Sequence, residues 1–330
     1  MAATVPPPVA KALDRRFGGT WTRAQALKNR AIRIFVQALL FAVDRMPRAM
    51  LVALGATAGR VARALDSDAL TRARARTAAA STASSDDVAS DCFVNAGRAL
   101  ATCALLRRDG VRAGECVSLS DESRAVLLRA LSAGRGAIVL SAHVGPFEMI
   151  PARLVEAGFA PSIVVRESYD PLLDPVVDDH RRRRGIEVIH RGKAGAALRI
   201  VRALRRGRPV GVLPDLGGRG LATLPARFLG RTVAFPVGPQ QLAHRTGCPL
   251  VMGTLARTSG ASAFELILED LASDGTLAEL TQRVADALAR AIVRSPADWL
   301  WMTAPHLAIA ADPETSLFSG IIHSAESGRA

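Results

Sequence analysis

Residues 136–150 read GAIVLSAHVGPFEMI. An apolar run ends close to His143, a Gly145-Pro146 turn follows, and a new helix containing Glu148 begins. A strand that passes through a turn into a helix is typical of a βαβ unit. His143 then lies just beyond the carboxyl end of a strand, the edge of an open α/β sheet at which functional sites collect.

Beyond Gly114, short β-branched runs alternate with segments rich in Ala, Arg and Leu, and this alternation predicts a βαβ sheet. Several predicted strands are apolar throughout, which indicates a sheet covered on both faces. The sequence therefore predicts an α/β fold with a mostly parallel central sheet flanked by helices. The predicted strands are 137–141, 162–166, 186–190, 210–213, 250–255 and 264–269, and the predicted helices between them are 147–157, 171–184, 194–206 and 236–246.

The amino-terminal part of the chain has a different texture. From about residue 24 to 107 it is dominated by Ala, Leu and Arg, with breaks at Pro47 and in the Ser/Asp cluster 81–87, which predicts three helices. The predicted organisation has four parts: a flexible leader over 1–20, an N-terminal helical, membrane-associating region over 21–113, an α/β domain over 114–305 and a loosely ordered tail over 306–330.

Two apolar stretches in the helical region bear on membrane contact. Residues 34–43 and 49–59 are each about half of the roughly 20 residues that a spanning helix needs, so no span is expected. Arginines flank both stretches, a pattern that suits a surface lying on anionic lipid. Two amphipathic helices packed on a core, with their arginines in solvent, would give the same pattern.

Composition narrows the class of protein. The chain has 330 residues, of which 49% are hydrophobic and 22% charged, so it is expected to fold. Its net charge of +13 comes almost entirely from arginine, because only three lysines are present, and guanidinium groups favour phosphate-bearing partners. A nucleic-acid-binding protein is an alternative, but only 4% of the residues are aromatic, no reader motif is present and the arginines are scattered.

The cysteines and the amino terminus point to the cytosol. The four cysteines have no paired spacing, so neither a zinc site nor a disulfide framework is predicted, and buried thiols in a reducing compartment are expected. The first residues lack the basic-then-apolar order of a secretory signal.

The strongest chemical signal is the pair His143 and Glu148. On an ideal helix the two would be about 140° apart, so they can face each other only if the backbone between them is irregular, which Gly145 and Pro146 allow. A histidine oriented by a carboxylate is a general base that needs no metal. A purely structural histidine is the alternative. Ser141 has no G-x-S-x-G context, so proton abstraction from a substrate hydroxyl is the simplest task for His143.

Several further motifs occur in a fixed order. Taken together, the motifs resemble those of the bacterial lipid A late acyltransferases, the lauroyl/myristoyl transferase branch of the lysophospholipid acyltransferase superfamily, over about residues 44–302. They are SAHVGPFE (141–148), VVRES (164–168), PLLDPVVDDHRRRRGIEVI (171–189), ALRRGRPVGVLPDLGGRG (203–220), RFLGRTVAFPVGPQQLAHRTGCPLV (227–251) and SPADWLWM (295–302).

The resemblance implies a glycerolipid acyltransferase-like fold and transfer of a fatty acyl group from acyl carrier protein or coenzyme A to a hydroxyl of a membrane lipid, as in lipid A-type biosynthesis. It implies that His143 is the base and Glu148 its orienting partner. Arg166 would bind a phosphate or help to stabilise the oxyanion, unless it is merely a surface arginine at a strand end. The other implied substrate-binding residues are Asp215 and Arg219 from the Pro-Asp block, and Phe228 and Gly230 from the acceptor loop.

The resemblance also implies partners and a location. The partners are an acidic acyl carrier protein or acyl-coenzyme A, used as co-substrate with no other cofactor and no metal, together with a phosphorylated lipid acceptor and the membrane surface, but no nucleic acid. The location is the cytoplasmic face of the inner membrane, with peripheral or monotopic attachment. The run 180–184, HRRRR, is either a contact for the acidic carrier or a solvated helix face.

Three departures from the family pattern leave a non-catalytic relative as a further alternative. Pro146-Phe147 stands where the family usually has Asn-Trp, and Leu216 replaces a polar residue. The closing tryptophan motif runs on into Met302 rather than into arginines. These changes leave the base in place and affect the expected acceptor.

Overall fold

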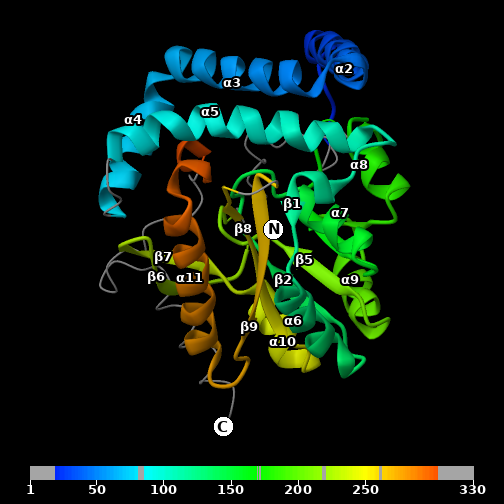
Figure 1. Ribbon diagram of the computed structural model, residues 1–330, viewed down its shortest axis with the longest axis vertical. Helices are drawn as coiled ribbons and strands as arrows, with labels where there is room; N and C mark the ends of the chain where they lie inside the picture. The colour runs from blue at the N-terminus through cyan, green and yellow to red at the C-terminus, as the bar shows by residue number, and fades with distance from the viewer. Residues whose placement is uncertain are drawn as a thin grey trace, which may run out of the picture.

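A seven-stranded sheet forms the centre of the protein in the computed structural model, which describes residues 19–80, 85–168, 170, 172–217, 221–259 and 262–303 (Figure 1). The strand order is β1-β9-β8-β2-β5-β3-β4. The neighbours β8, β2, β5, β3 and β4 run parallel, and β9 is antiparallel to β8. The predicted mostly parallel sheet is thereby confirmed. The strands are β1 (Val117–Ser118), β2 (Ala137–Leu140), β3 (Ser162–Val165), β4 (Glu187–His190), β5 (Pro209–Val212), β8 (Leu250–Arg257) and β9 (Phe264–Leu271).

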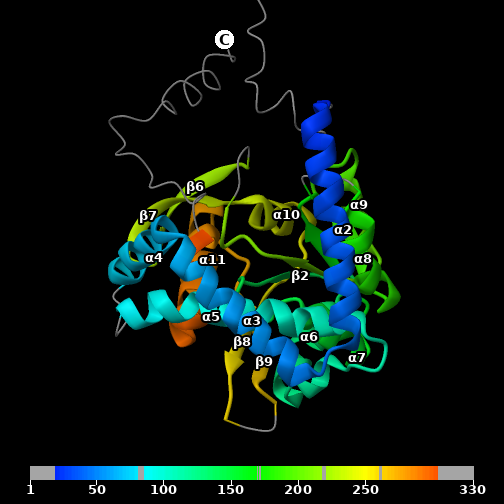
Figure 2. The ribbon, with the colours of Figure 1, turned by 90° about the horizontal axis from the view of Figure 1, so that it is seen from above.

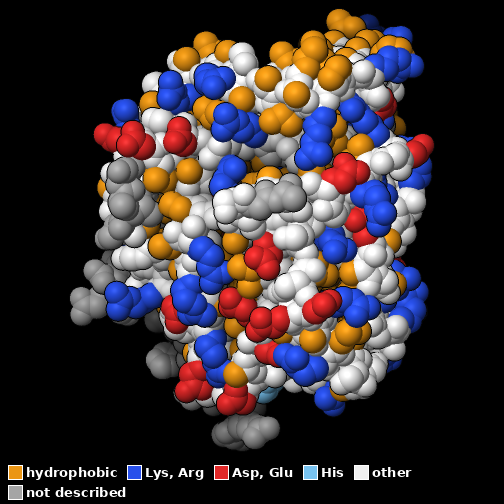
Figure 3. Space-filling view, viewed as in Figure 1, with side chains coloured by type: hydrophobic (Ala, Val, Ile, Leu, Met, Phe, Trp, Pro, Cys, Tyr) orange, Lys and Arg blue, Asp and Glu red, His pale blue; other side chains and the backbone are white. Residues whose placement is uncertain are grey.

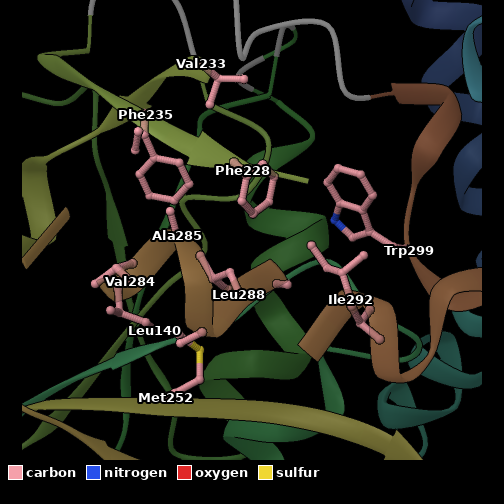
Figure 4. Close-up of a cluster of buried hydrophobic side chains, with 14 of the residues drawn as sticks. Leu140, Phe228, Val233, Phe235, Met252, Val284, Ala285, Leu288, Ile292 and Trp299 are labelled. Atoms are coloured by element: carbon pink, nitrogen blue, oxygen red, sulfur yellow. The ribbon is translucent and has the colours of Figure 1, made fainter. Parts of the chain in front are cut away.

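Helices cover both faces of this sheet, as the apolar sequence of β2 requires. Ile138 and Leu140 point into one hydrophobic cluster and Ala137 and Val139 into another, because successive side chains of a strand alternate between its faces. Figure 4 shows part of the first cluster, in which Leu140 lies beside Met252, and side chains of α11 lie between this pair and the rings of Phe228 and Trp299. The helices around the sheet are α6 (Asp121–Ser132), α7 (Met149–Glu156), α8 (Asp174–Arg183), α9 (Ala196–Arg205), α10 (Gly238–Thr246) and α11 (Leu277–Arg294).

Some elements of the α/β part were not among those predicted. Helices α6 and α11 both carry N-terminal signals in the sequence: Ser120 caps α6, and Thr276 forms a capping box with Glu279 at the start of α11. The two-stranded hairpin of β6 (Thr223–Phe228) and β7 (Arg231–Pro236) was also missed. Its prolines make both strands read as loop.

In the described residues between 19 and 104, the chain forms four α-helices rather than the three predicted for the amino-terminal region. They are α2 (Arg23–Arg45), α3 (Arg48–Leu65), α4 (Ser67–Ala79) and α5 (Ser85–Ala104). The extra break falls at Asp66, whose side chain accepts a hydrogen bond from the backbone N–H of Ala69 and so starts α4 as a separate helix. These helices form a layer over one end of the sheet, in which α3 lies along α5 and α2 crosses one end of the layer (Figures 1 and 2). The predicted leader over 1–20 falls largely on residues 1–18, which lie outside the described residues. The predicted tail over 306–330 lies outside them as well.

Glycines allow α3 and α5 to pack closely. A Cβ atom added to Gly97 of α5 would lie 2.0 Å from the carbonyl oxygen of Gly55 in α3, and one added to Gly59 would lie 2.2 Å from the carbonyl oxygen of Phe93. Both obstacles are backbone atoms, which cannot rotate away. The two helices therefore approach at a distance that only glycine permits.

We expect Gly97→Ala to destabilise the protein by about 3 kcal/mol, the upper end of the usual cost of overpacking, because α3 and α5 must separate. Thermal or urea unfolding of the purified variant measures this. Gly110→Ala is the matched control, since a Cβ there meets nothing within 4 Å. Equal stability of the two variants would contradict the close packing described here.

None of the helices in the described part of the chain combines the length and the apolar character needed to cross a membrane.

Candidate active site

The carboxyl ends of two neighbouring parallel strands bring His143 and Asp215 together. Strands β2 and β5 pair in a register that sets Leu140 beside Val212, and the backbone N–H of Ser141 continues the ladder by donating to Val212 O at 3.0 Å. His143 and Asp215 each lie three residues beyond these partners. The strand register therefore places the two side chains opposite each other at the edge where α/β sheets bind ligands.

Three N–H groups hold the Asp215 carboxylate. His143 Nδ1 lies 2.8 Å from Oδ1, while the backbone N–H of His143 and the indole Nε1–H of Trp299 donate to Oδ2 at 2.8 and 2.7 Å. A carboxylate only accepts hydrogen bonds, so the hydrogen of the neutral imidazole is on Nδ1. The second ring nitrogen, Nε2, makes no hydrogen bond within the described residues and is free to accept a proton.

The environment of His143 makes it a stronger base than an ordinary histidine. Burial alone lowers its pKa, but the charge of Asp215, the hydrogen bond to it and the charge of Glu148 outweigh burial, and the pKa of His143 is raised. The ring of Phe147 packs edge-on against the imidazole with centroids 4.7 Å apart. Asp215 is fully buried, so its carboxylate has no access to solvent or substrate.

The predicted pairing of His143 with Glu148 is corrected by this geometry. The backbone between them is irregular, with Gly145 at φ +57°, but the carboxylate of Glu148 accepts from Arg181, with Nε to Oε2 at 3.1 Å and a second bond from Nη2 to Oε1. Glu148 raises the pKa of His143 through its charge, whereas the hydrogen-bonding partner of the ring is Asp215. A carboxylate that already accepts two hydrogen bonds from one guanidinium is a poor partner for an imidazole N–H.

Arg181 belongs to a buried charge network. Its Nη1 donates to Asp178 at 2.9 Å, and the other oxygen of Asp178 accepts from His190 Nε2 at 2.7 Å. Arg181, Asp178 and His190 are all buried. Glu148 is therefore fixed by a chain of ionic hydrogen bonds that ends on β4.

The run 180–184 is thus neither a free basic patch nor a fully solvated helix face. Arg181 is part of the network, and Arg184 donates to the carbonyl oxygens of Leu106, Arg108 and Val111 at 2.7–2.9 Å. Both side chains hold α8 in place.

A cavity of about 530 Å³ opens beside His143. Its volume is within the range of roughly 300–1,000 Å³ that is usual for small-molecule sites. Apolar side chains of α7, β3 and β5 line most of it, and the charged groups at its wall are His143, Glu148 and three arginines. The apolar residues include Ile150, Pro151, Leu154, Ile163, Val165 and Val212, and the arginines are Arg166, Arg181 and Arg191.

The other predicted site residues are placed as follows. Arg166 lines this cavity. Asp215, which was expected to bind substrate, is buried and accepts hydrogen bonds from His143. Phe228 is buried against Phe235 and Trp299, and Gly230 forms the turn of the β6–β7 hairpin with φ +78°. Both lie at a separate hollow, so their role in substrate binding stays a prediction. Arg219 lies outside the described residues.

Several site residues were missed by sequence reasoning. Trp299 stands in a quoted motif, yet no local signal links it to Asp215. The link is structural: Val144 forms a β-bridge with Trp299, and Gly145 donates its N–H to Asp298 O at 3.0 Å, which ties the turn after β2 to the end of the described chain. Arg191 follows a predicted strand end and could have been found by pairing β3 with β4 in register.

The cysteines do not line this cavity, and the described side chains form no metal site. The cysteines are free, and burial raises the pKa of each thiol, that of Cys92 to about 12. Among the described residues, no group of His, Cys, Asp and Glu side chains is arranged to hold a metal ion.

Comparison with known proteins identifies the family. A phosphatidylinositol mannoside acyltransferase of Mycolicibacterium smegmatis is 29% identical over 196 residues, which cover 58% of this chain and 62% of the relative. One of Mycobacterium tuberculosis is 29% identical over 175 residues, which cover 52% of this chain and 54% of the relative. The chain thus spans between half and two thirds of the curated relatives that it matches. The family model described as bacterial lipid A biosynthesis acyltransferase matches residues 22–305, and this chain belongs to that family.

Proposed function

We propose that this protein transfers a fatty acyl group from an activated donor to a hydroxyl group of a membrane glycolipid. The observation that carries the proposal is the His143–Asp215 pair at the wall of a mostly apolar cavity of about 530 Å³. Such a cavity accommodates an aliphatic chain, and the imidazole beside it can take a proton from an alcohol. The family and the names of the relatives supply the class of reaction.

In the proposed reaction His143 acts as a general base. Its Nε2 takes the proton of the acceptor hydroxyl, and the oxygen attacks the carbonyl carbon of an acyl thioester. We propose that backbone N–H groups stabilise the resulting tetrahedral oxyanion by hydrogen bonding. The C–O bond forms, the C–S bond breaks, and the imidazolium returns the proton to the departing sulfur. Asp215 stabilises the imidazolium while the proton is held there. No acyl-enzyme is needed, because a thioester is already activated.

Acyl carrier protein and coenzyme A are the two proposed donors. Both are acidic, and the formal charge of +13 on this chain favours encounter with either. For the acceptor, the family name points to lipid A and the names of the relatives point to mannosylated phosphatidylinositol. Both are glycolipids that carry phosphate and free hydroxyl groups. We therefore propose a phosphorylated glycolipid as the acceptor.

We propose that the protein lies on the cytoplasmic face of the inner membrane. Helices α2 and α3 support contact with a membrane surface. Of the large hydrophobic side chains that are exposed in the described residues, most lie on these two helices, including Phe35 at 68% exposure. In Figure 3 they gather with Lys and Arg along the edge formed by α2 and α3. Apolar side chains interspersed with cationic ones are typical of a surface that rests on anionic lipid.

Phe35→Asp combined with Leu39→Asp is expected to weaken binding to vesicles that contain anionic lipid by at least about tenfold, because two side chains on one face of α2 lose their apolar contact with the bilayer. Cosedimentation with the vesicles measures this. Leu128→Asp on α6 is the matched control, since Leu128 is exposed on a different part of the molecule. Unchanged binding by the double variant would rule out α2 as the docking surface.

Transfer itself is tested with purified protein, palmitoyl thioesters of coenzyme A and of acyl carrier protein, and two acceptors, a phosphatidylinositol mannoside and a lipid A precursor. Mass spectrometry is expected to show one acceptor gaining a palmitoyl group while the thioester is consumed. Lipids extracted from cells with and without the gene then name the natural acceptor. A protein that consumes no thioester with any acceptor would be a non-catalytic relative, and this proposal would be wrong.

A further inference from the structure

Two arginines lie side by side where strands β3 and β4 end. The register of these parallel strands sets Val165 beside His190, so Arg166 and Arg191 are the next pair along. The backbone N–H of Arg191 donates to Val165 O at 2.9 Å, which extends the ladder to this point. Both side chains are exposed and both line the cavity of His143. The fold thus places two like charges together at the wall of that cavity.

Neither guanidinium is neutralised by a neighbouring side chain. Across the described ranges, Arg166 and Arg191 have no ion pair or hydrogen bond to a carboxylate, in contrast to Arg181 in the same cavity, which is paired with two. The pKa of Arg191 is lowered by partial burial of its guanidinium and further by the charge of Arg166, while Glu167 acts in the opposite sense. Two cations held this close repel each other unless an anion lies between them.

Glu167, the acidic side chain whose charge acts on Arg191, is hydrogen-bonded to the backbone. Glu167 accepts the N–H of Gly192 at 2.8 Å, and a Cβ at Gly192 would lie 2.7 Å from the same carboxylate. This contact joins the loop after β3 to the loop after β4. It fixes the spacing of Arg166 and Arg191 before any ligand binds, and such preorganisation reduces the entropy lost on binding.

We propose that Arg166 and Arg191 together form a subsite for a phosphate group of a substrate, with each guanidinium donating to the phosphate oxygens. Paired guanidinium forks match the oxygens of a phosphate in both charge and geometry. The inference rests on the proposed function in one respect: the phosphate belongs to the donor or the acceptor of acyl transfer. A phosphate held here fixes one end of that substrate in the same cavity as His143.

Equilibrium binding separates the two sources of phosphate without requiring turnover. Coenzyme A is the donor probe, with pantetheine as its phosphate-free counterpart, and dihexanoyl phosphatidylinositol below its micelle concentration is the acceptor probe. Titration calorimetry is run on the full chain and on Arg166→Gln, Arg191→Gln and the double variant. Arg205→Gln is the control, because Arg205 is exposed on α9 and does not line the cavity.

We expect Arg191→Gln and Arg166→Gln each to weaken binding of one probe by about 10- to 100-fold, the usual effect of losing a charged hydrogen-bond donor, while Arg205→Gln changes nothing. The double variant should lose less than the product of the two effects, because both groups hold one phosphate. The affected probe identifies the source.

Wild-type protein that binds neither probe, or Arg191→Gln that binds both as the wild type does, would overturn the subsite. If the arginine variants lose binding of a phosphate probe but the wild-type protein transfers no acyl group, the subsite stands and the proposed function is rejected. The two failures are therefore distinguishable.

Discussion

His143→Ala is expected to lower kcat for acyl transfer by about 10²- to 10⁴-fold, the usual contribution of a positioned general base. The loss should appear in kcat rather than in KM, since the imidazole acts on the proton and the apolar wall of the cavity is unchanged. Steady-state transfer from palmitoyl-coenzyme A, followed by mass spectrometry of the lipid product, measures it. The imidazole is only partly buried, so the fold should tolerate its removal.

His244→Ala provides the comparison for this variant. His244 is exposed on α10 and does not line the cavity, so its replacement should leave kcat near the wild-type value. Circular dichroism and thermal unfolding check that both variants are folded. Near-wild-type transfer by a folded His143→Ala protein would reject the assignment of the base.

Asp215→Asn is expected to reduce kcat by up to about 10⁴-fold through the tautomer of His143. Two N–H groups, the backbone of His143 and the indole of Trp299, point at Oδ2 and require an oxygen there. The amide nitrogen of the new asparagine must then face His143 Nδ1, which can accept its hydrogen only if the imidazole proton moves to Nε2. An Nε2 that carries a hydrogen cannot take one from the acceptor, so the residual activity comes from the minor neutral tautomer with its hydrogen on Nδ1, whose population still follows the pKa of the ring.

Thermal unfolding of Asp215→Asn separates this effect from loss of the fold, because the asparagine still accepts from the main chain and Trp299 at one oxygen. Trp299→Phe keeps the packing but removes one of the three donors to Asp215, and it should cost less activity than Asp215→Asn. A folded Asp215→Asn protein with full activity would show that the tautomer of His143 is not set by Asp215.

Local sequence patterns were sufficient for the parallel part of the sheet. The apolar runs that became β2, β3, β4, β5 and β8 stand between polar helices, and each was predicted within a few residues of its observed ends. The β6–β7 hairpin was missed because Pro225 and Pro236 interrupt it, and the extra helix break at Asp66 depends on one capping side chain. The helix break depends on one hydrogen bond and the hairpin on strands that contain proline, and hydrophobic periodicity reports neither feature.

The site was only partly predictable for a different reason. His143 and Glu148 are close in sequence, so their spacing suggested a pair, whereas Asp215 is 72 residues from His143 and meets it only through the register of β2 with β5. Trp299 lies 84 residues beyond Asp215 in the sequence and donates the indole hydrogen bond to its carboxylate. Strand order and register are set by the whole core, and no local motif encodes them. Arg166 was identified through the resemblance to the family, whereas Arg191 lies beside it only through the register of β3 with β4.

If the carboxylate at Nδ1 makes His143 the base, as we propose, the pH dependence of kcat/KM must follow the titration of this one ring. Transfer requires neutral His143, so the rate rises as pH passes upward through its pKa, which is raised above the ordinary histidine value. Removing either carboxylate lowers that pKa, and Asp215 raises it more than Glu148 does. We predict that this acid limb moves to lower pH in Asp215→Asn and Glu148→Gln, and further in Asp215→Asn. An unmoved limb in Asp215→Asn, or a larger shift in Glu148→Gln, would contradict the account.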